Sequence, residues 1–197
     1  MSGAHIWAGF SLGLRFRREL ACILRETPAE ASIRSLDPTA LAKGGIAALA
    51  LDFDGVLAPH GFPAPLPEAE EWLRRCAAVF GPDKLFILSN KPTDERRRWF
   101  AGHFPEIRFI SGVAKKPFPD GLATIGELAH VPLSAILMVD DRLLTGCLAA
   151  LNAGARPSYV RRPYVSLDQR PLIELFFMLL RVGERVFVRL LSPRLLS

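Results

Sequence analysis

Cysteine and long hydrophobic runs are scarce in this chain of 197 residues. The three cysteines, Cys22, Cys76 and Cys147, lie far apart, and no CxxC or Cys/His metal spacing occurs. This usage argues against a disulfide framework or a zinc site and fits a reducing compartment. The longest apolar run, Leu175 to Leu180, falls far short of the roughly 18 residues that predict a transmembrane helix.

The N-terminus lacks the early positive charge and the cleavage site of a secretory signal peptide. It is free of acidic residues and bears arginine up to Arg18, so a mitochondrial transit peptide stays an alternative. The formal net charge of +5 is unevenly distributed. Residues 1–44 carry 6 basic and 4 acidic side chains, residues 45–155 carry 11 and 13, and residues 156–197 carry 8 and 3. The basic C-terminal segment suggests an anionic partner, membrane surface or nucleic acid, beside the alternative of ordinary solubility charge.

One stretch, Ala47 to Leu57, combines a strand pattern with two carboxylates. The apolar run Ala47–Leu51 predicts a buried strand of a parallel sheet. Asp52 and Asp54 follow, and burying an unpaired charge inside such a strand would be very costly. Open α/β sheets bind their ligands at the carboxyl ends of the strands, so both acids can serve one site there. The alternative is a strand-to-loop turn with solvated aspartates.

Apolar runs and helical patterns alternate along residues 45–165, which predicts an α/β fold with a doubly wound parallel sheet and helices on both faces. Residues 1–44 form an N-terminal extension, and residues 166–197 a C-terminal amphipathic, basic helical segment. The expected strands are Ala47–Leu51, Lys84–Leu88, Ile107–Ile110, Ala135–Val139 and Ser158–Val160. The expected helices of the core are Glu68–Phe80, a helix capped by Thr93, Asp120–His130 and Leu143–Ala153.

Polar residues follow several of these strands, and the topology predicts that they meet at one edge of the sheet. Ser89 and Asn90 end the second strand, Lys116 lies in the loop after the third, and Asp140 and Asp141 end the fourth. The run Arg96, Arg97 and Arg98 is expected to form a solvated helix face rather than an anion site.

The motif order DxDG, Ser-Asn, Lys-Pro and Asp-Asp resembles the haloacid dehalogenase-like superfamily of phosphatases. The resemblance implies that Asp52 is a nucleophile that forms an aspartyl-phosphate. It implies that Asp54 is the general acid and then the base for the hydrolytic water. Ser89, Asn90 and Lys116 would bind the substrate phosphate, with Lys116 balancing the negative charge.

The same resemblance implies a Mg²⁺ site. Asp52, Asp141 with the adjacent Asp140, and the backbone carbonyl of Asp54 would hold the ion, which prefers hard oxygen ligands. Superfamily members that act on small metabolites often carry a cap domain. Neither stretch between the motifs is long enough for one, so we expect an open site and a large substrate: a lipid head group, a protein or a nucleic-acid end.

The flanks, including FISGVAKKPFPDGL and MVDDRLLTGCLAALNAGARPSYVRRP, resemble the class IIIA branch whose known members are phosphatidylglycerophosphate phosphatases. This implies a phosphorylated-lipid substrate, an anionic membrane partner and no nucleic acid. It also implies a cytoplasmic protein, peripheral on the inner face of the membrane, with the mitochondrial matrix as the alternative. The oligomeric state stays open. The other functions considered are a phosphatase of a soluble or protein-borne phosphate, and a weakened phosphate-binding or scaffold protein.

Three departures from the branch stand at the motifs. The branch has Asn-Thr where this chain has Gly55-Val56, and Gly-Asp where it has Asp140-Asp141. It also has an acid after the threonine of the fourth motif, where this chain has Gly146. We expect Asp140 to compensate for the acid that is absent at Gly146.

The segment Pro171 to Leu191 predicts a helix with two distinct stripes. Such a helix can lie on anionic lipid, or dock on the core with its arginines in water. The apolar stripe is Leu172, Phe176, Leu179, Val182, Val186 and Leu190, and the basic stripe is Arg181, Arg185 and Arg189.

Overall fold

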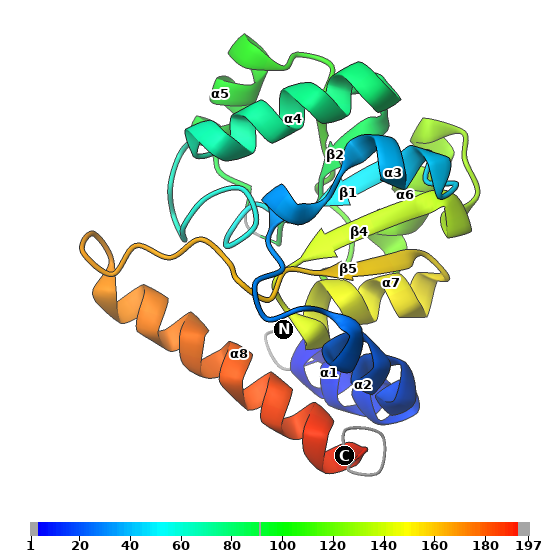
Figure 1. Cartoon of the computed structure of the whole chain (residues 1–197), viewed down its shortest axis with the longest axis vertical. Helices are drawn as coiled ribbons and strands as arrows, with labels where there is room; N and C mark the ends of the chain where they lie inside the picture. Colours follow the sequence, from blue (N-terminus) through cyan, green and yellow to red (C-terminus); the bar gives the residue numbers. More distant parts are fainter. Residues whose placement is uncertain (1–3, 91, 193–197) are drawn as a thin grey trace.

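The fold is built on a five-stranded sheet in which every strand pair is parallel, with the order β3-β2-β1-β4-β5. It is seen in a computed structural model that describes residues 4–90 and 92–192. The strands are β1 Ala48–Leu51, β2 Leu85–Ile87, β3 Arg108–Phe109, β4 Ile136–Asp140 and β5 Arg156–Tyr159. Helices flank the sheet (Figure 1), so the predicted α/β class and the five expected strands are confirmed, with small shifts of their ends.

The helices of the core also follow the sequence pattern. They are α4 Pro67–Phe80, α5 Asp94–His103, α6 Asp120–Ala129 and α7 Leu148–Ala153. The N-terminal segment forms α1 Ala4–Arg15, α2 Arg17–Glu26 and α3 Pro38–Lys43, and the C-terminal segment forms α8 Pro171–Leu191. Short 3-10 turns are η1 Ile33–Ser35, η2 Pro82–Lys84 and η3 Leu133–Ala135. One expected helix, Leu143–Ala153, is divided into a π-helical turn, η4 Leu143–Cys147, and α7.

Successive residues of β1 point to opposite faces of the sheet, and each face has its own apolar core. Leu49 and Leu51 pack with Trp72 of α4 and Phe100 of α5. On the other face lie Ala48 and Ala50 of β1, with Leu122 and Ile125 of α6 and Ala149 of α7. Both faces of the sheet are therefore covered, which explains why β1 is continuously apolar.

The N-terminal helices belong to a third apolar cluster beside β5. Leu20 and Leu24 of α2 pack with Leu148 of α7, Tyr159 of β5 and Val188 of α8. Figure 1 shows α1 and α2 between the end of the sheet and α8. The helices α1 and α2 thus pack on this side of the sheet together with α8.

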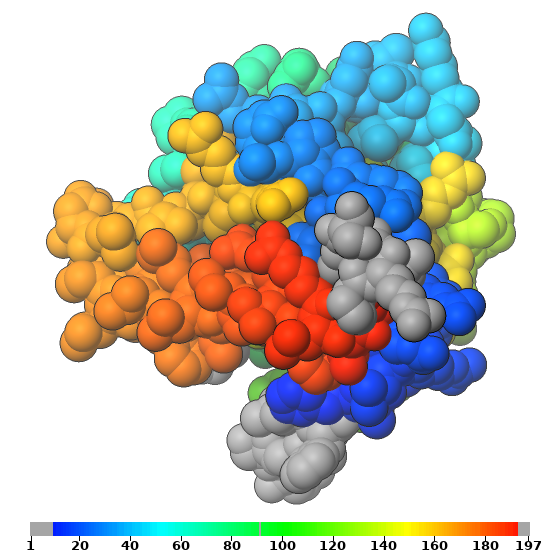
Figure 2. Space-filling model, turned by 60° about the horizontal axis from the view of Figure 1, so that its bottom comes forward, coloured from blue at the N-terminus to red at the C-terminus, as the bar shows by residue number. Residues whose placement is uncertain are grey.

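The helix α8 turns its charged side inward and its apolar side outward. Glu174, Arg181 and Glu184 are buried together with Val188. The outer face of α8 consists of exposed apolar residues: Leu172, Ile173, Leu175, Phe176, Met178, Leu179, Val182, Val186 and Leu190. Leu172 is 81% exposed and Leu190 is 74% exposed, which argues against the alternative in which this apolar stripe docks on the core. Arg181 is 3% exposed, so it is not part of an exposed basic stripe as predicted. Figure 2 shows α8 beside the N-terminal helices.

Candidate active site

The candidate site lies where β1 and β4 end side by side. From β1 the chain runs outward through β2 and β3 on one side, and through β4 and β5 on the other. Ligands of open α/β sheets bind at such a reversal of strand order, outside the carboxyl ends of the strands. Asp52 directly follows β1, and its N–H donates to Val139 O over 2.9 Å. Asp140 is the last residue of β4. The parallel register therefore places both acids at one edge.

A buried lysine joins the two strand ends. Lys116 Nζ lies 3.1 Å from Asp52 Oδ2 and 2.5 Å from Asp140 Oδ2. Asp52 Oδ1 also accepts from the N–H of Phe53 over 2.8 Å. Lys116 is 4% exposed, whereas the Asp52 side chain is 14% exposed. Asp52 is thus the more accessible member of this group, as a nucleophile has to be.

Burial makes the ionised form of the carboxylates at this edge costly. Burial raises the pKa of Asp52 to about 7; Lys116 opposes this rise, and the nearby carboxylates add to it. Burial also raises the pKa of Asp140 and brings that of Asp141 to about 6. Burial disfavours the charged form of Lys116, but the carboxylates of Asp140 and Asp52 outweigh this effect and raise its pKa. The site therefore holds a charged lysine among carboxylates whose raised pKa values favour the binding of a further cation or a proton.

Hard oxygen donors gather here at a spacing that suits a divalent cation. Ligand atoms of Asp52, Asp140 and Asp141 lie within 4.8 Å of one another. Carboxylate oxygens are the ligands that Mg²⁺ prefers. Both oxygens of Asp140 already have donors, Lys116 Nζ over 2.5 Å and the N–H of Arg142 over 2.8 Å. Asp52 likewise has Phe53 N–H and Lys116 as neighbours, and Asp141 Oδ2 accepts from Arg181. The chemistry of these three carboxylates fits a magnesium ion.

The carboxylate of Asp54 faces away from this cluster and binds an arginine. Arg96 Nη1 donates to Asp54 Oδ2 over 3.0 Å, and Arg96 Nη2 to Asp54 Oδ1 over 2.6 Å. The N–H of Gly61 donates to Oδ1 over 3.0 Å. Burial raises the pKa of Asp54, but the hydrogen bonds and charge of Arg96 outweigh it, so the pKa falls below its usual value. In this arrangement Asp54 is an ionised carboxylate.

Arg96 corrects the prediction of a solvated triple-arginine face. It is 2% exposed, and its guanidinium carbon lies 3.9 Å from the centroid of the Phe53 ring. Its Nε donates to Phe62 O over 2.9 Å. A sequence signal existed, because Phe100 lies four residues on and belongs to the core, which puts Arg96 on the inward face of α5.

The predicted phosphate-binding residues lie at the same edge. Ser89 is buried just beyond β2. Asn90 accepts through Oδ1 from the N–H of Lys116 over 3.1 Å, so in this structure it holds the loop that carries Lys116. Thr93 caps α5 as predicted, since its side chain accepts from the N–H of Arg96.

The buried charges of α8 close the site from one side. Glu174 accepts from the N–H of His60 over 2.9 Å, and Arg181 Nε donates to Asp141 Oδ2 over 2.6 Å. Glu184 accepts from Arg142 Nε over 2.8 Å and from the N–H of Leu143 over 2.9 Å. These contacts fix α8 on the loops that follow β1 and β4.

Sequence reasoning missed this role of α8, because partners about 40 to 114 residues away leave no local pattern. The available signal was the inward spacing of Glu174, Arg181, Glu184 and Val188, which repeats at seven, three and four residues. Such spacing marks one face of a helix.

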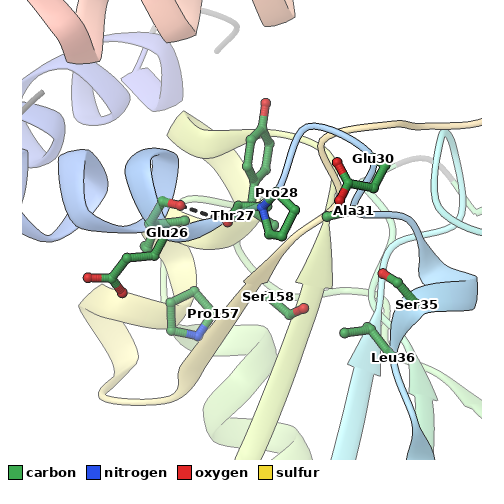
Figure 3. A pocket seen from close by; sticks show the side chains of 11 residues that line it. Glu26, Thr27, Pro28, Glu30, Ala31, Ser35, Leu36, Pro157 and Ser158 are labelled. Atoms are coloured by element: carbon green, nitrogen blue, oxygen red, sulfur yellow. Dashed lines mark hydrogen bonds between the residues drawn. The ribbon is translucent and has the colours of Figure 1, made fainter.

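A cavity of about 450 Å³ lies apart from the candidate site, between the end of α2, the loop that follows it and β5. Figure 3 shows its wall, with Glu26 near Pro157 on one side, Glu30 near Ala31 on the other, and Ser158 between them. None of the predicted site residues lines it. We therefore place the chemistry at the ends of β1 and β4.

Comparison with known proteins gives the chain no family. No protein-family model matches it. No curated protein matches it either. Among solved structures, the chain is similar to the crystal structure of an uncharacterized protein from Corynebacterium glutamicum. The two share 20% sequence identity with a TM-score of 0.45, over 71% of this chain and 96% of the other.

Proposed function

We propose that the chain is a capless, Mg²⁺-dependent phosphatase of the haloacid dehalogenase type that hydrolyses a phosphomonoester through an aspartyl-phosphate. One observation carries the proposal: the partly accessible Asp52, at the end of the central strand, lies 3.1 Å from the buried Lys116. Asp141 lies in the same acid cluster. A carboxylate nucleophile, a fixed cation and hard oxygen ligands at one strand edge are the parts that phosphoryl transfer to an acid requires.

In the first step, an Asp52 oxygen forms a bond to phosphorus while the bond from phosphorus to the ester oxygen breaks. Lys116 is held within contact of Asp52, so its charge reduces the repulsion between the carboxylate and the phosphoryl oxygens. In the second step, water attacks the same phosphorus and Asp52 leaves as a carboxylate. A bound Mg²⁺, held by Asp52 and Asp141, would shield the negative charge of both partners.

In the first step protonated Asp54 donates its proton to the leaving ester oxygen, and in the second step the resulting carboxylate takes a proton from the attacking water. Its ion pair with Arg96 keeps it ionised. This state suits a base. To act as an acid, Asp54 has to leave Arg96 when substrate binds.

The substrate we propose is phosphatidylglycerophosphate at a membrane surface. Among the described residues, α4, η2 and β2 stand between Asp54 and Ser89, and α5 and β3 between Ser89 and Lys116, so neither stretch as described forms a cap. An open edge admits a large substrate. The outer face of α8 supplies the second argument, because exposed apolar surface of this extent is typical of a protein or membrane contact. No described helix is long and apolar enough to cross a bilayer. We propose that α8 lies on the membrane, with the exposed Arg189 toward anionic head groups.

A second candidate is a phosphate-binding or scaffold protein with weak turnover. The observation that favours it is the bidentate pairing of Asp54 with Arg96, which withdraws the general acid from the site. The same fold acting on a soluble or protein-borne phosphate is the remaining alternative.

Phosphate release with Mg²⁺ tests the proposal. Purified protein is given phosphatidylglycerophosphate in mixed micelles, a water-soluble phosphomonoester and a phosphopeptide. We expect release to be greatest with the lipid and abolished in Asp52→Asn. The exposed Asp83, changed to asparagine, serves as the matched control. Equal release by wild type and Asp52→Asn would contradict the catalytic proposal, and a preference for a soluble phosphate would contradict the lipid substrate.

Vesicle flotation tests the membrane contact. Leu179→Glu, on the outer face of α8, is compared with Leu128→Glu, an exposed leucine of α6. We expect only Leu179→Glu to reduce binding to vesicles that contain phosphatidylglycerol, with both variants as stable as wild type. Undiminished flotation of Leu179→Glu would remove α8 as the contact.

A further inference from the structure

The buried guanidinium of Arg181 is bound to one carboxylate of the acid cluster. Arg181 lies on α8, and its Nε donates to Asp141 Oδ2 over 2.6 Å, while its Nη2 lies 2.5 Å from the same oxygen. The side chains of Arg181 and Asp141 are 3% and 2% exposed. Asp141 is also one of the three aspartates whose ligand atoms lie within 4.8 Å of one another. A positive charge of the protein therefore already occupies one of the oxygens at this cluster.

Arg181 is held less completely than the other buried arginine of the site. Arg96 donates to both oxygens of Asp54 and to Phe62 O. Among the described residues, by contrast, Nη1 and Nη2 of Arg181 are buried without a hydrogen-bond partner. Leaving buried donors of a charged group unpaired is unfavourable. The charge of Asp141, rather than a full set of hydrogen bonds, therefore holds Arg181 in place.

The ion pair of Arg181 and Asp141 lies directly against the loop that follows β1. A Cβ at position 55 would lie 2.3 Å from Asp141 Oδ2 and 2.9 Å from Arg181 Nη2. Gly55 also has a φ of +80°, which favours glycine there. The guanidinium thus reaches the candidate site itself, next to the loop that carries Asp54.

In the metal-free protein each of the three clustered aspartates contacts a side-chain cation. Asp52 and Asp140 share Lys116, and Asp141 has Arg181. A divalent cation on Asp141 would bring two more positive charges beside the guanidinium. Like charges repel strongly where little water screens them. Mg²⁺ and Arg181 therefore compete for Asp141.

We propose that Arg181 is a built-in counter-cation of the metal site: it occupies Asp141 in the absence of metal and lowers the affinity of the site for Mg²⁺. The proposal rests on the metal site of the proposed function. Coupling between two bound groups is reciprocal, so Mg²⁺ on Asp141 weakens the contact of Arg181 by the same factor. Metal binding is thereby linked to α8, the helix that carries the exposed apolar face.

Isothermal titration of the full chain with Mg²⁺ alone tests the competition. Burial raises the pKa of Asp52 to about 7 and that of Asp141 to about 6, so a buffer near pH 8 limits competition by protons. Arg181→Gln removes the charge but keeps an N–H that can donate to Asp141, and Arg181→Lys keeps the charge. Arg189→Gln removes an exposed charge from the same helix and serves as the matched control.

We expect Arg181→Gln to bind Mg²⁺ about tenfold more tightly than wild type, because a repelling charge is gone. Arg181→Lys and Arg189→Gln should stay within about threefold of wild type. Equal or weaker binding by Arg181→Gln would overturn the proposal, and so would an equal gain in Arg189→Gln, since net charge would then explain it. If no protein of the set binds Mg²⁺, the proposal and the metal site both fail. Tighter binding by Arg181→Gln without phosphate release by wild type would refute only the catalytic function.

A spectroscopic measurement on wild type decides the question even where Arg181→Gln fails to fold. The Nε–H signal of Arg181 in a ¹H–¹⁵N spectrum is assigned by its loss in Arg181→Lys. At saturating Mg²⁺ we expect this signal to shift and its proton to exchange faster with water, because the hydrogen bond to Asp141 is lost. The Nε–H signal of Arg96, which donates to Phe62 O, should stay unchanged. An Arg181 signal that does not respond to saturating Mg²⁺ would overturn the proposal.

Discussion

The pair formed by Arg96 and Asp54 gives the sharpest stability prediction. Arg96→Met keeps much of the side-chain volume but removes both hydrogen bonds to Asp54 and the stacking on Phe53. Breaking a buried pair on one side costs about 3–5 kcal/mol, because the other charge is left unpaired. The Asp54 side chain is 22% exposed, so water replaces part of the loss. We therefore expect the lower end, a free energy of unfolding reduced by about 3 kcal/mol near pH 7.

The pH dependence of this loss has a definite sign. Burial alone would raise the pKa of Asp54, but Arg96 brings it below the value of 3.8 that applies to the unfolded chain. A carboxyl with a lowered pKa stabilises the fold fully above the unfolded value and loses that effect as the pH falls through the folded value. In Arg96→Met, burial acts on Asp54 without the arginine and raises its pKa above 3.8. The difference between wild type and Arg96→Met is therefore largest near pH 7, and it shrinks as the pH falls through the raised pKa of the variant toward the lowered pKa of wild type.

Urea unfolding followed by circular dichroism measures both quantities. Arg98→Met, an exposed arginine on the same helix, is the control and should change stability by less than about 0.5 kcal/mol. A loss of similar size in both variants would show that helix propensity, and not the ion pair, governs the result. A loss that grows toward acidic pH would refute the assignment to Asp54.

Three further predictions follow from buried groups near the site. Arg181→Met leaves the buried Asp141 without its cation, so urea unfolding should show a loss of about 3–5 kcal/mol, whereas the exposed Arg189→Met should stay near wild type. Burial lowers the pKa of His60 despite the opposing charges of Asp54 and Glu174. Because the unfolded chain then binds more protons than the folded one, the free energy of unfolding should fall as the pH drops below about 6.5. His60→Gln should make the free energy of unfolding less dependent on pH in this range. Mg²⁺ at about 100 times its Kd should stabilise wild type by about 2.7 kcal/mol and raise its Tm, an effect that Asp141→Asn should lose; an equal rise in that variant would contradict the metal site.

The sequence predicted the strands and most of the site for one physical reason. In a parallel sheet the apolar runs are buried on both faces, and polar residues begin where the strands end. Asp52, Lys116 and Asp140 could therefore be assigned to one edge before any coordinate was known. Their convergence is confirmed by the distances between them.

Two features were missed, because the partners that explain them lie far along the chain. The exposed apolar side of α8 has the same local spacing as a core-facing helix, and only its contacts with His60 and Asp141 show which side is buried. Arg96 looks like its neighbours in the sequence, yet it pairs with a residue 42 positions away. The spacing of residues along a helix shows which of them share a face, but it does not show what that face contacts.

The central claim is that Asp52 accepts the phosphoryl group, and acid-quenched intact mass spectrometry tests it most directly. Protein mixed with Mg²⁺ and phosphatidylglycerophosphate is quenched within the first turnover, and peptide mapping locates the modification. We predict a mass increase of one phosphoryl group on the peptide that contains Asp52, which Asp52→Asn lacks and Asp83→Asn retains. Phosphate release with no phosphoryl group on Asp52, or a phosphoryl group on another residue, would contradict the account.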